Sequence, residues 1–293
     1  MDLNNLLRAK NIDPEQVLVF RHSPTEPQLK KVFPWLAAER PDLFNAYQQS
    51  QGAKLEKAMT AGKAHYVASF IGHTPGRALF VGLYSIAGSS PLTYREYWSV
   101  PANVELKEKF GMAGMEDDRP SCLWFDLSLM DMFADWKGKL IVRWPPPEIS
   151  WWRWAAKNEI PVHAILEESA LDTDAGLRKW NEIELSWDDL HVMPERWKSK
   201  LREWRGVYYI FDSSDGKGYV GSAYGEENML GRWLGYKSSG HGDNVRLRER
   251  DPKNFQFTIL QLMSPNEDAG KVIQLESTWK VRLHTRTHGL NAN

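Results

Sequence analysis

The spacing of apolar and polar positions in the last third of the chain predicts a small α+β domain. Segments 206–211, 218–223 and 255–262 are rich in β-branched and aromatic residues, which predicts three strands. Apolar residues at helical spacing predict two helices, one over 226–239 and one over 270–285. The resulting order, β-β-α-β-α, is typical of a small sheet with helices packed on it.

The same pattern predicts a strand-rich domain of mixed α and β structure before residue 199. Apolar runs predict strands at 17–22, 65–73, 78–86, 122–133, 140–147 and 162–168. The strands at 65–73 and 78–86 are expected to form one pair, and those at 122–133 and 140–147 a second pair. Helical spacing is present over 26–51, interrupted by Pro34 and Pro41, and again over 151–159. We expect a small curved or closed sheet with helices at its start and end, and the strand pairing stays open.

The highly charged segment 194–206 is expected to be a helix that leads into a strand. Such a segment suits a rigid connector between two domains. We therefore expect a DNA or substrate-recognition domain over residues 1–198 and a second domain over 199–293, with an α+β fold overall.

Composition excludes several classes of protein. The chain has no apolar run of eighteen residues and no basic-then-apolar start, so neither a spanning helix nor a secretory signal is expected. A single cysteine, Cys122, excludes an intrachain disulfide and a cysteine-rich zinc site, and it fits a cytoplasmic protein. The net charge of −1 does not indicate a polyanion partner, so nucleic-acid binding would need a local basic surface.

Tryptophan is unusually frequent, with 14 residues, of which eleven precede residue 200. Aromatic side chains can stack on nucleic-acid bases. Large core and interface residues are the simpler explanation for most of them.

The predicted hairpin places two tyrosines together. Tyr208 and Tyr219 lie on adjacent strands and can share a face. On the helix that follows, Arg232 and Tyr236 are four residues apart and therefore lie on one side. Packing of an antiparallel hairpin and an ordinary surface arginine explain these features when each is taken alone.

Glu276 is the most informative single position. At 100° per residue it falls inside the apolar stripe that Val272, Trp279 and Leu283 form on the last helix, widened by Ile273 and Leu275. A carboxylate there is unfavourable unless it is paired or bound to a metal. The alternative is a glutamate at the domain rim bonded to an arginine.

Taken together, GVY (206–208), YVG (219–221), Arg232, Glu276 and Asn291 resemble the GIY-YIG nuclease family over about residues 204–293. Isoleucine is replaced by valine in both motifs, which preserves strand propensity. The resemblance implies hydrolysis of DNA phosphodiesters with one Mg²⁺ or Mn²⁺ ion per active site, held by Glu276.

The resemblance also implies a role for each candidate residue. Arg232 would stabilise charge on the phosphoryl oxygens. Tyr208, with Tyr219 or Tyr236, would orient and deprotonate the attacking water, helped by nearby cations. Asn291 would fix the substrate or the sheet through its amide. Lys217 and His241 are weaker, supporting candidates.

We expect a metal-dependent endonuclease whose first domain selects DNA, as in a restriction-type phage defence enzyme that acts on modified bases. A repair or recombination nuclease that recognises DNA structure is the alternative. A binding module on a nuclease fold without catalysis is the third interpretation. Whether the protein forms a homodimer stays open, and no membrane partner is expected.

Overall fold

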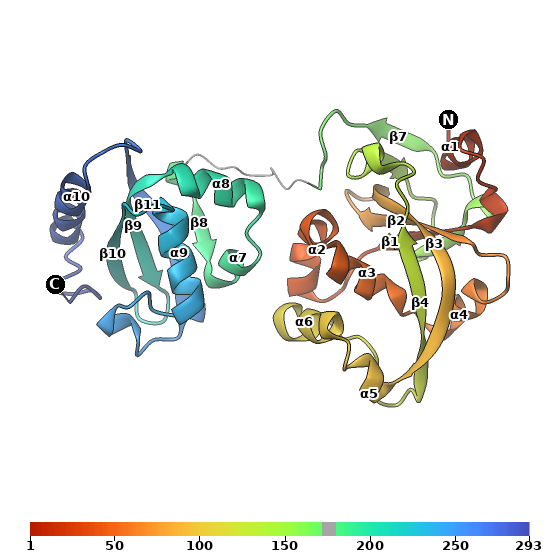
Figure 1. Cartoon of the computed structure of the whole chain (residues 1–293), viewed down its shortest axis with the longest axis horizontal. Helices are drawn as coiled ribbons and strands as arrows, with labels where there is room; N and C mark the ends of the chain where they lie inside the picture. The colour runs from red at the N-terminus through yellow and green to blue at the C-terminus, as the bar shows by residue number, and fades with distance from the viewer. Residues whose placement is uncertain (172–179, 293) are drawn as a thin grey trace. The chain divides into compact units, whose positions relative to one another are not determined.

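The computed structural model describes residues 1–171 and 180–292, which fall into two compact units. The N-terminal unit lies within residues 1–174 and the C-terminal unit within 175–293 (Figure 1). Both combine helices with a largely antiparallel sheet, which agrees with the α+β class expected from sequence. No helix among the described residues has both the length and the apolar character that a membrane crossing requires.

The C-terminal unit is built on a four-stranded sheet with the order β10-β9-β11-β8, in which all neighbours are antiparallel. Its strands are β8 (Glu184–Ser186), β9 (Arg205–Asp212), β10 (Lys217–Ala223) and β11 (Phe255–Met263). Its helices are α7 (Trp187–His191), α8 (Glu195–Glu203), α9 (Asn228–Ser239) and α10 (Ala269–Arg282). The predicted β-β-α-β-α order is therefore present from β9 to α10.

The edge strand β10 lies between the two long helices (Figure 1). Tyr208 pairs with Gly221 and Ile210 with Tyr219, so these four residues share one face of the sheet. That face packs on α9 through buried Trp233. Helix α10 lies beside β10 and meets the strand from its other side, where Ser222 contacts Glu276.

The C-terminal unit begins earlier than the boundary expected after residue 198. Strand β8 pairs with β11, and Leu185 and Leu190 are buried in the same core as Leu201. Three of the eleven tryptophans before residue 200, namely Trp180, Trp187 and Trp197, also pack against this core. The charged segment at 194–206 forms α8 and the start of β9, as predicted, but it lies inside this unit.

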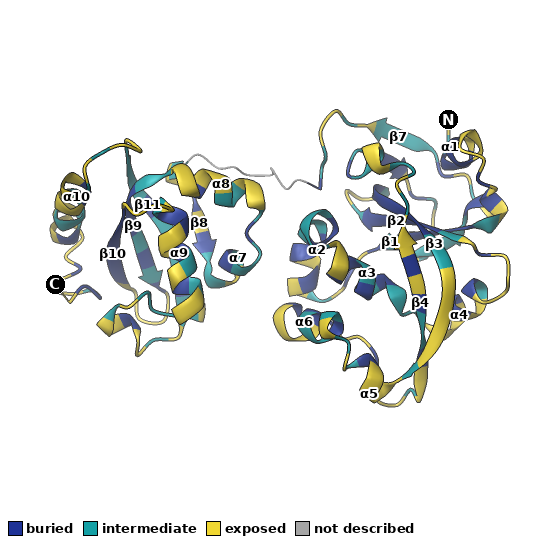
Figure 2. Cartoon of the chain, in the orientation of Figure 1, coloured by how far each residue is buried: buried dark blue, intermediate teal, exposed yellow. Residues whose placement is uncertain are grey.

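The N-terminal unit contains a seven-stranded sheet with the order β6-β1-β2-β3-β5-β7, and β4 pairs with β3. Its strands are β1 (Val17–His22), β2 (Tyr66–Gly72), β3 (Arg77–Thr93), β4 (Ser121–Leu129), β5 (Leu140–Arg143), β6 (Trp152–Trp154) and β7 (Val162–Ile165). Among these seven described strands, only the β1–β2 pair is parallel. The later part of β3 is exposed and pairs with β4 in a long ribbon (Figure 2).

The described residues of this unit form six α-helices: α1 (Leu3–Ala9), α2 (Pro27–Glu39), α3 (Pro41–Gln49), α4 (Ala53–Met59), α5 (Tyr94–Tyr97) and α6 (Pro101–Phe110). Helices α2, α3 and α6 pack together. As predicted, Pro41 separates two helices, because it occupies the first position of α3. Pro34 does not break α2, whose buried Leu29, Phe33 and Leu36 hold it in place.

Two expectations for this unit are wrong. Residues 151–159 do not form a helix, because Trp152–Trp154 pairs with β1 as strand β6 and is followed by a 3₁₀ turn. Strands β4 and β5 are not partners, since both pair with β3. Short-range pattern cannot show such pairing, because the partners are distant in sequence.

Candidate active site

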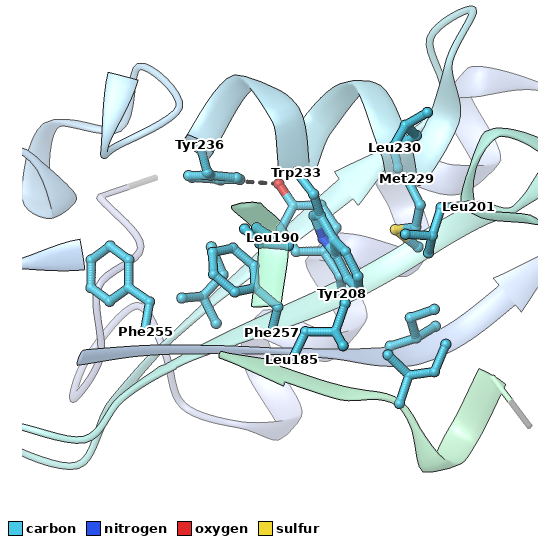
Figure 3. Packing of buried hydrophobic residues seen from close by; sticks show 14 of the residues in the cluster. Leu185, Leu190, Leu201, Tyr208, Met229, Leu230, Trp233, Tyr236, Phe255 and Phe257 are labelled. Carbon is cyan, nitrogen blue, oxygen red and sulfur yellow. Dashed lines mark hydrogen bonds between the residues drawn. The ribbon is translucent and has the colours of Figure 1, made fainter. Parts of the chain in front are cut away.

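Three tyrosines meet beneath α9. Tyr208 from β9 and Tyr236 from α9 are fully buried, and their hydroxyl oxygens are 3.0 Å apart (Figure 3). Tyr219 from β10 is also buried, and its ring centroid lies 6.5 Å from that of Tyr236. The structure therefore brings together the three tyrosines that the sequence predicted for the site.

The glycines of both motifs are explained by close packing. A β-carbon on Gly221 would collide with the phenol of Tyr208, which lies over this position. A β-carbon on Gly206 would collide with the backbone carbonyl of Gln261, at the irregular pairing between β9 and β11. The glycine in YVG therefore makes room for the tyrosine of GVY.

Arg232 reaches the cluster from the exposed side of α9. Its Nε donates to the Tyr208 hydroxyl at 3.4 Å, and its guanidinium carbon lies 5.8 Å from the centre of the Tyr236 ring. Within the described residues it makes no ion pair. A guanidinium is permanently charged and carries five donors. Arg232 is thus available for an anion beside the tyrosine hydroxyls.

Burial dominates the acid–base properties of the tyrosines. It raises the pKa of Tyr208 far above its ordinary value, and the charge of Arg232 only partly offsets this effect. Burial, followed by the negative charge of Glu276, also raises the pKa of Tyr219. Both groups are therefore neutral phenols at physiological pH. They are suited to orienting a water through hydrogen bonds, whereas the expected deprotonation of that water is not favoured in this state.

A loop after α9 completes the cluster. The side-chain amide of Asn244 donates to the Tyr236 hydroxyl at 3.0 Å. His241, the supporting candidate, lies half-buried in the same loop and accepts from the backbone N–H of Asp243 at 3.0 Å. The loop positions Asn244, and no described hydrogen bond joins His241 to the three tyrosines.

Glu276 lies at the edge of β10, in a polar environment. Its Oε1 is 2.7 Å from Nζ of Lys280, and Oε2 accepts a hydrogen bond from Ser222. The side chains of Glu276 and Lys280 are only 14% and 6% exposed. The partner expected for a rim glutamate was an arginine, whereas the structure provides a lysine one helical turn later.

The buried side of α10 differs from the predicted apolar stripe. Val272 is fully buried, but Leu283 and Ile273 are exposed, and Trp279 is half-buried. The buried line runs through Val272, Glu276 and Lys280, at a spacing of four residues. The prediction that Glu276 lies on the inner side of the helix is therefore correct, although the stripe is less apolar than expected.

The donor set near Glu276 fits one kind of metal site. Among the described residues, no group of three or more His, Cys, Asp or Glu side chains is placed to hold a metal. Mg²⁺ is commonly bound by one or two carboxylates together with water and substrate phosphates. Glu276, whose carboxylate contacts Lys280 and Ser222, could supply the one carboxylate of that pattern but not a full protein cage.

Asn291 acts on the sheet itself. Its Oδ1 accepts from the backbone N–H of Val220 at 2.9 Å, and its Nδ2 donates to the Val220 carbonyl at 2.8 Å. The side chain is buried and occupies the outer edge of β10 as a further strand would. It holds the strand that carries Tyr219 in place.

Lys217 lies apart from the tyrosines. Its ammonium group pairs with Asp215 at 3.0 Å, in the turn between β9 and β10. Arg250 binds both Asp212 and Asp215 in the same region. Lys217 therefore belongs to a charged group at the hairpin turn, and it is not one of the cations that act on Tyr208.

Three side chains in or beside the site were not predicted: Ser222, Asn244 and Lys280. Ser222 directly follows YVG, and Lys280 is four residues after Glu276, a spacing that predicts contact on a helix. These two had a signal in the sequence. Asn244 lies in a loop without a pattern that indicates its partner.

Comparisons with known proteins found similarity to solved structures of one endonuclease domain. No family model matches the chain, and no curated protein matches it. Among solved structures, the catalytic domain of the homing endonuclease I-TevI is 24% identical, with coverage of 30% of this chain and 98% of that domain and a TM-score of 0.26. A mutant of the catalytic domain of the intron endonuclease I-TevI is 21% identical, with coverage of 31% and 94% and the same TM-score.

Proposed function

We propose that this protein is a metal-dependent DNA endonuclease whose C-terminal unit hydrolyses phosphodiester bonds. The observation that carries the proposal is the charge arrangement at β10. Arg232, a cation without a carboxylate partner among the described residues, contacts buried Tyr208. The charge of Glu276 acts on the neighbouring Tyr219. In metal-dependent phosphodiester hydrolysis, such a cation can stabilise charge on the phosphoryl oxygens and such a carboxylate can hold the metal ion.

Each residue has a task that follows from its contacts. Arg232 would donate to the phosphoryl oxygens as their negative charge increases. Tyr208 and Tyr236 would orient the attacking water through neutral hydroxyls, and Asn244 fixes the Tyr236 hydroxyl. Glu276 would hold the Mg²⁺ or Mn²⁺ ion, which would supply charge stabilisation at the phosphoryl group.

A restriction-type role, in which the N-terminal unit selects modified DNA, is the finer part of the proposal. It is supported by the division of the chain into two compact units, one of which contains all the candidate catalytic residues. A repair or recombination nuclease would instead prefer branched or damaged DNA. Cleavage of plain, cytosine-modified and branched duplexes by the full chain separates the two roles.

The direct test is Glu276→Gln in the full chain. We expect cleavage of DNA in the presence of Mg²⁺ to fall at least roughly a hundredfold, as when a group that stabilises charge in the transition state is lost, with DNA binding retained. Glu267→Gln is the matched control, because Glu267, just before the same helix, pairs with an exposed lysine, Lys271, at the same spacing of four residues. Full activity of Glu276→Gln would exclude Glu276 as the metal ligand, and no cleavage by the unmodified protein would overturn the proposal.

A further inference from the structure

A cavity of about 800 Å³ lies in the N-terminal unit. It opens where β1 ends and continues along the following loop. Residues from α3, from 112–122 and from 148–151 form its other walls. The volume falls within the range of pockets that hold organic ligands, and it exceeds what a bare purine or pyrimidine ring needs.

Aromatic side chains form much of its wall. Tyr47 from α3, Tyr97 from α5 and Trp151 all line the cavity, and His22 from the end of β1 lies between Tyr47 and Trp151. Ring centroids of His22 are 5.4 Å from Tyr47 and 6.2 Å from Trp151. Such walls suit a flat heterocycle, because every nucleobase has a face that stacks on aromatic rings.

A buried network fixes the hydrogen-bonding state of His22. Gln48 Nε2 donates to Asn45, so Gln48 Oε1 is the acceptor, and it receives the Ser69 hydroxyl hydrogen. His22 Nε2 lies 3.3 Å from that same oxygen and therefore donates its hydrogen to it. Burial lowers the pKa of His22 to about 4, so the ring is neutral at physiological pH and its other nitrogen is left as an acceptor. An uncharged polar group of this kind suits recognition of an uncharged, hydrogen-bonding base.

The cavity also has a charged rim. Arg21 lies beside the aromatic walls, where it pairs with Glu148 at 3.2 Å and lies 5.9 Å from the Trp144 ring. Its Nε is buried without a hydrogen-bond partner among the described residues. A permanently charged guanidinium at the rim of an aromatic pocket suits the phosphate or sugar oxygens attached to a base.

We propose that this cavity receives a single nucleobase extruded from duplex DNA, with space for a substituent on the base. The inference rests on the proposed function, since it takes DNA as the substrate. Extrusion has a free-energy cost, which is lower for an unpaired base, and stacking in the pocket offsets it. Trp151 and Tyr47 supply the stacking faces, His22 reads the base and Arg21 binds the backbone.

The test measures binding by the full chain carrying Glu276→Gln, in magnesium-free buffer. The probes are fluorescent duplexes that are fully paired, that contain one base opposite an abasic site, or that contain one 5-methylcytosine, 5-hydroxymethylcytosine or N6-methyladenine. We expect the duplex with the unpaired base to bind at least tenfold more tightly than the paired one. The modified duplexes show which substituent strengthens binding further.

Trp151→Ala should remove most of the preference for the unpaired base, because stacking accounts for roughly 1–3 kcal/mol per base, about five- to 150-fold. Trp151→Phe should keep most of it. Trp35→Ala is the matched control, since Trp35 lies on α2, contacts Phe110 and does not line the cavity. Circular dichroism verifies that each variant is folded. If Trp151→Ala does not fold, the proposal is tested with Trp151→Phe.

No preference among these duplexes in the parent protein would overturn the proposal, as would an equal loss in Trp151→Ala and Trp35→Ala. Unchanged preference in folded Trp151→Ala would have the same effect. Cleavage of plain DNA by the unmodified protein is measured separately. If the protein cuts DNA but shows no preference for the unpaired base, only the proposal for the cavity is contradicted. If it prefers the unpaired base but does not cut DNA, only the proposed nuclease activity is contradicted.

Discussion

The two units gather their functional side chains over very different distances along the chain. In the C-terminal unit, Tyr208, Tyr219, Arg232 and Tyr236 come from one hairpin and the helix after it. In the N-terminal unit, the cavity combines the end of β1 with α3 and with residues up to Trp151. The part of a site that comes from one supersecondary motif leaves a readable pattern in sequence, whereas a cavity made from distant segments does not.

The units also differ in which buried groups respond to pH. The N-terminal unit buries His22, whose pKa is lowered, whereas both units bury tyrosines, such as Tyr84 and Tyr208, whose pKa values are raised. Acid should therefore weaken the N-terminal unit through His22, and alkali should weaken both units through their buried tyrosines. Four experiments test these differences between the units, in order of decreasing expected effect.

The largest effect is expected from moving the boundary of the C-terminal unit. A fragment over 199–293 lacks Ile183, Leu185, Leu190 and Met193, all buried in its core. At about 1.5–3 kcal/mol for each large apolar side chain, the loss is roughly 6–12 kcal/mol, comparable to the whole stability of a domain. We expect 180–293 to unfold cooperatively in urea and 199–293 to be unfolded. Equal urea midpoints for the two fragments would show that β8 and α7 are dispensable.

The second experiment concerns His22. Burial lowers its pKa to about 4 from 6.5. Between these values the unfolded chain binds more protons than the folded one, so stability that is complete above pH 6.5 is lost as the pH falls. At about 1.4 kcal/mol per pH unit, the loss is about 3 kcal/mol by pH 4. Urea unfolding followed by tryptophan fluorescence at pH 7, 5.5 and 4 measures it.

His22→Gln should be less stable at pH 7 but should lose this acid dependence, because it has no titrating group. His73→Gln, at an exposed position, should keep the dependence of the parent protein. An unchanged acid slope in His22→Gln would assign it to other groups. The buried tyrosines have the opposite sign: their raised pKa values preserve stability at neutral pH and remove it as the pH rises above about 10.

The third experiment tests Arg232 as a donor to the phosphoryl group. Arg232→Ala should lower kcat roughly a hundredfold, similar to the loss of one oxyanion donor. Arg232→Lys should recover only part of the rate, because a point charge does not reproduce the guanidinium fork. Arg202→Ala is the control, since Arg202 forms an exposed pair with Glu227 in the same unit. A fully active lysine variant would mean that only positive charge is needed.

Sequence predicted much of the C-terminal unit because local pattern determines it. The tyrosines of GVY and YVG were expected on one face, and the register of β9 and β10 places them there. Strand β8 was missed because it has three residues and pairs with β11, about seventy positions away. Because that pairing cannot be seen in the sequence, the domain boundary was predicted from the charged residues of α8. That boundary falls inside the C-terminal unit rather than before it.

The N-terminal unit was less predictable, for the same physical reason. Residues 151–159 have helical composition, but pairing with β1 makes 152–154 a strand, so tertiary contacts override local preference. The aromatic lining of the cavity was also hidden. Eight of the fourteen tryptophans lie within residues 1–171, and Trp151 is the one that lines the cavity. The number of tryptophans therefore did not indicate where a ligand would stack.

The smallest effect concerns the buried face of α10, where a charged pair replaces the expected apolar stripe. Lys280→Met keeps an apolar stem but removes the ammonium group that lies 2.7 Å from Glu276. The Glu276 carboxylate would still accept the hydrogen bond from Ser222 and would still be slightly exposed to solvent. Removing one partner of a buried pair usually destabilises by 3–5 kcal/mol. Because this carboxylate retains other partners, we expect a loss of about 1–2 kcal/mol in the free energy of unfolding.

Lys271→Met provides the matched control, because Lys271 pairs with Glu267 at 2.9 Å with the same spacing but at an exposed position. Exposed pairs contribute about 0–1 kcal/mol, and less at high salt. Urea unfolding of both variants at low and high salt should give the larger and less salt-sensitive loss for Lys280→Met. Equal losses would mean that burial adds nothing to the Glu276–Lys280 pair. Glu276 would then be held mainly by Ser222, and the polar line on α10 would have to be explained by its role at the active site.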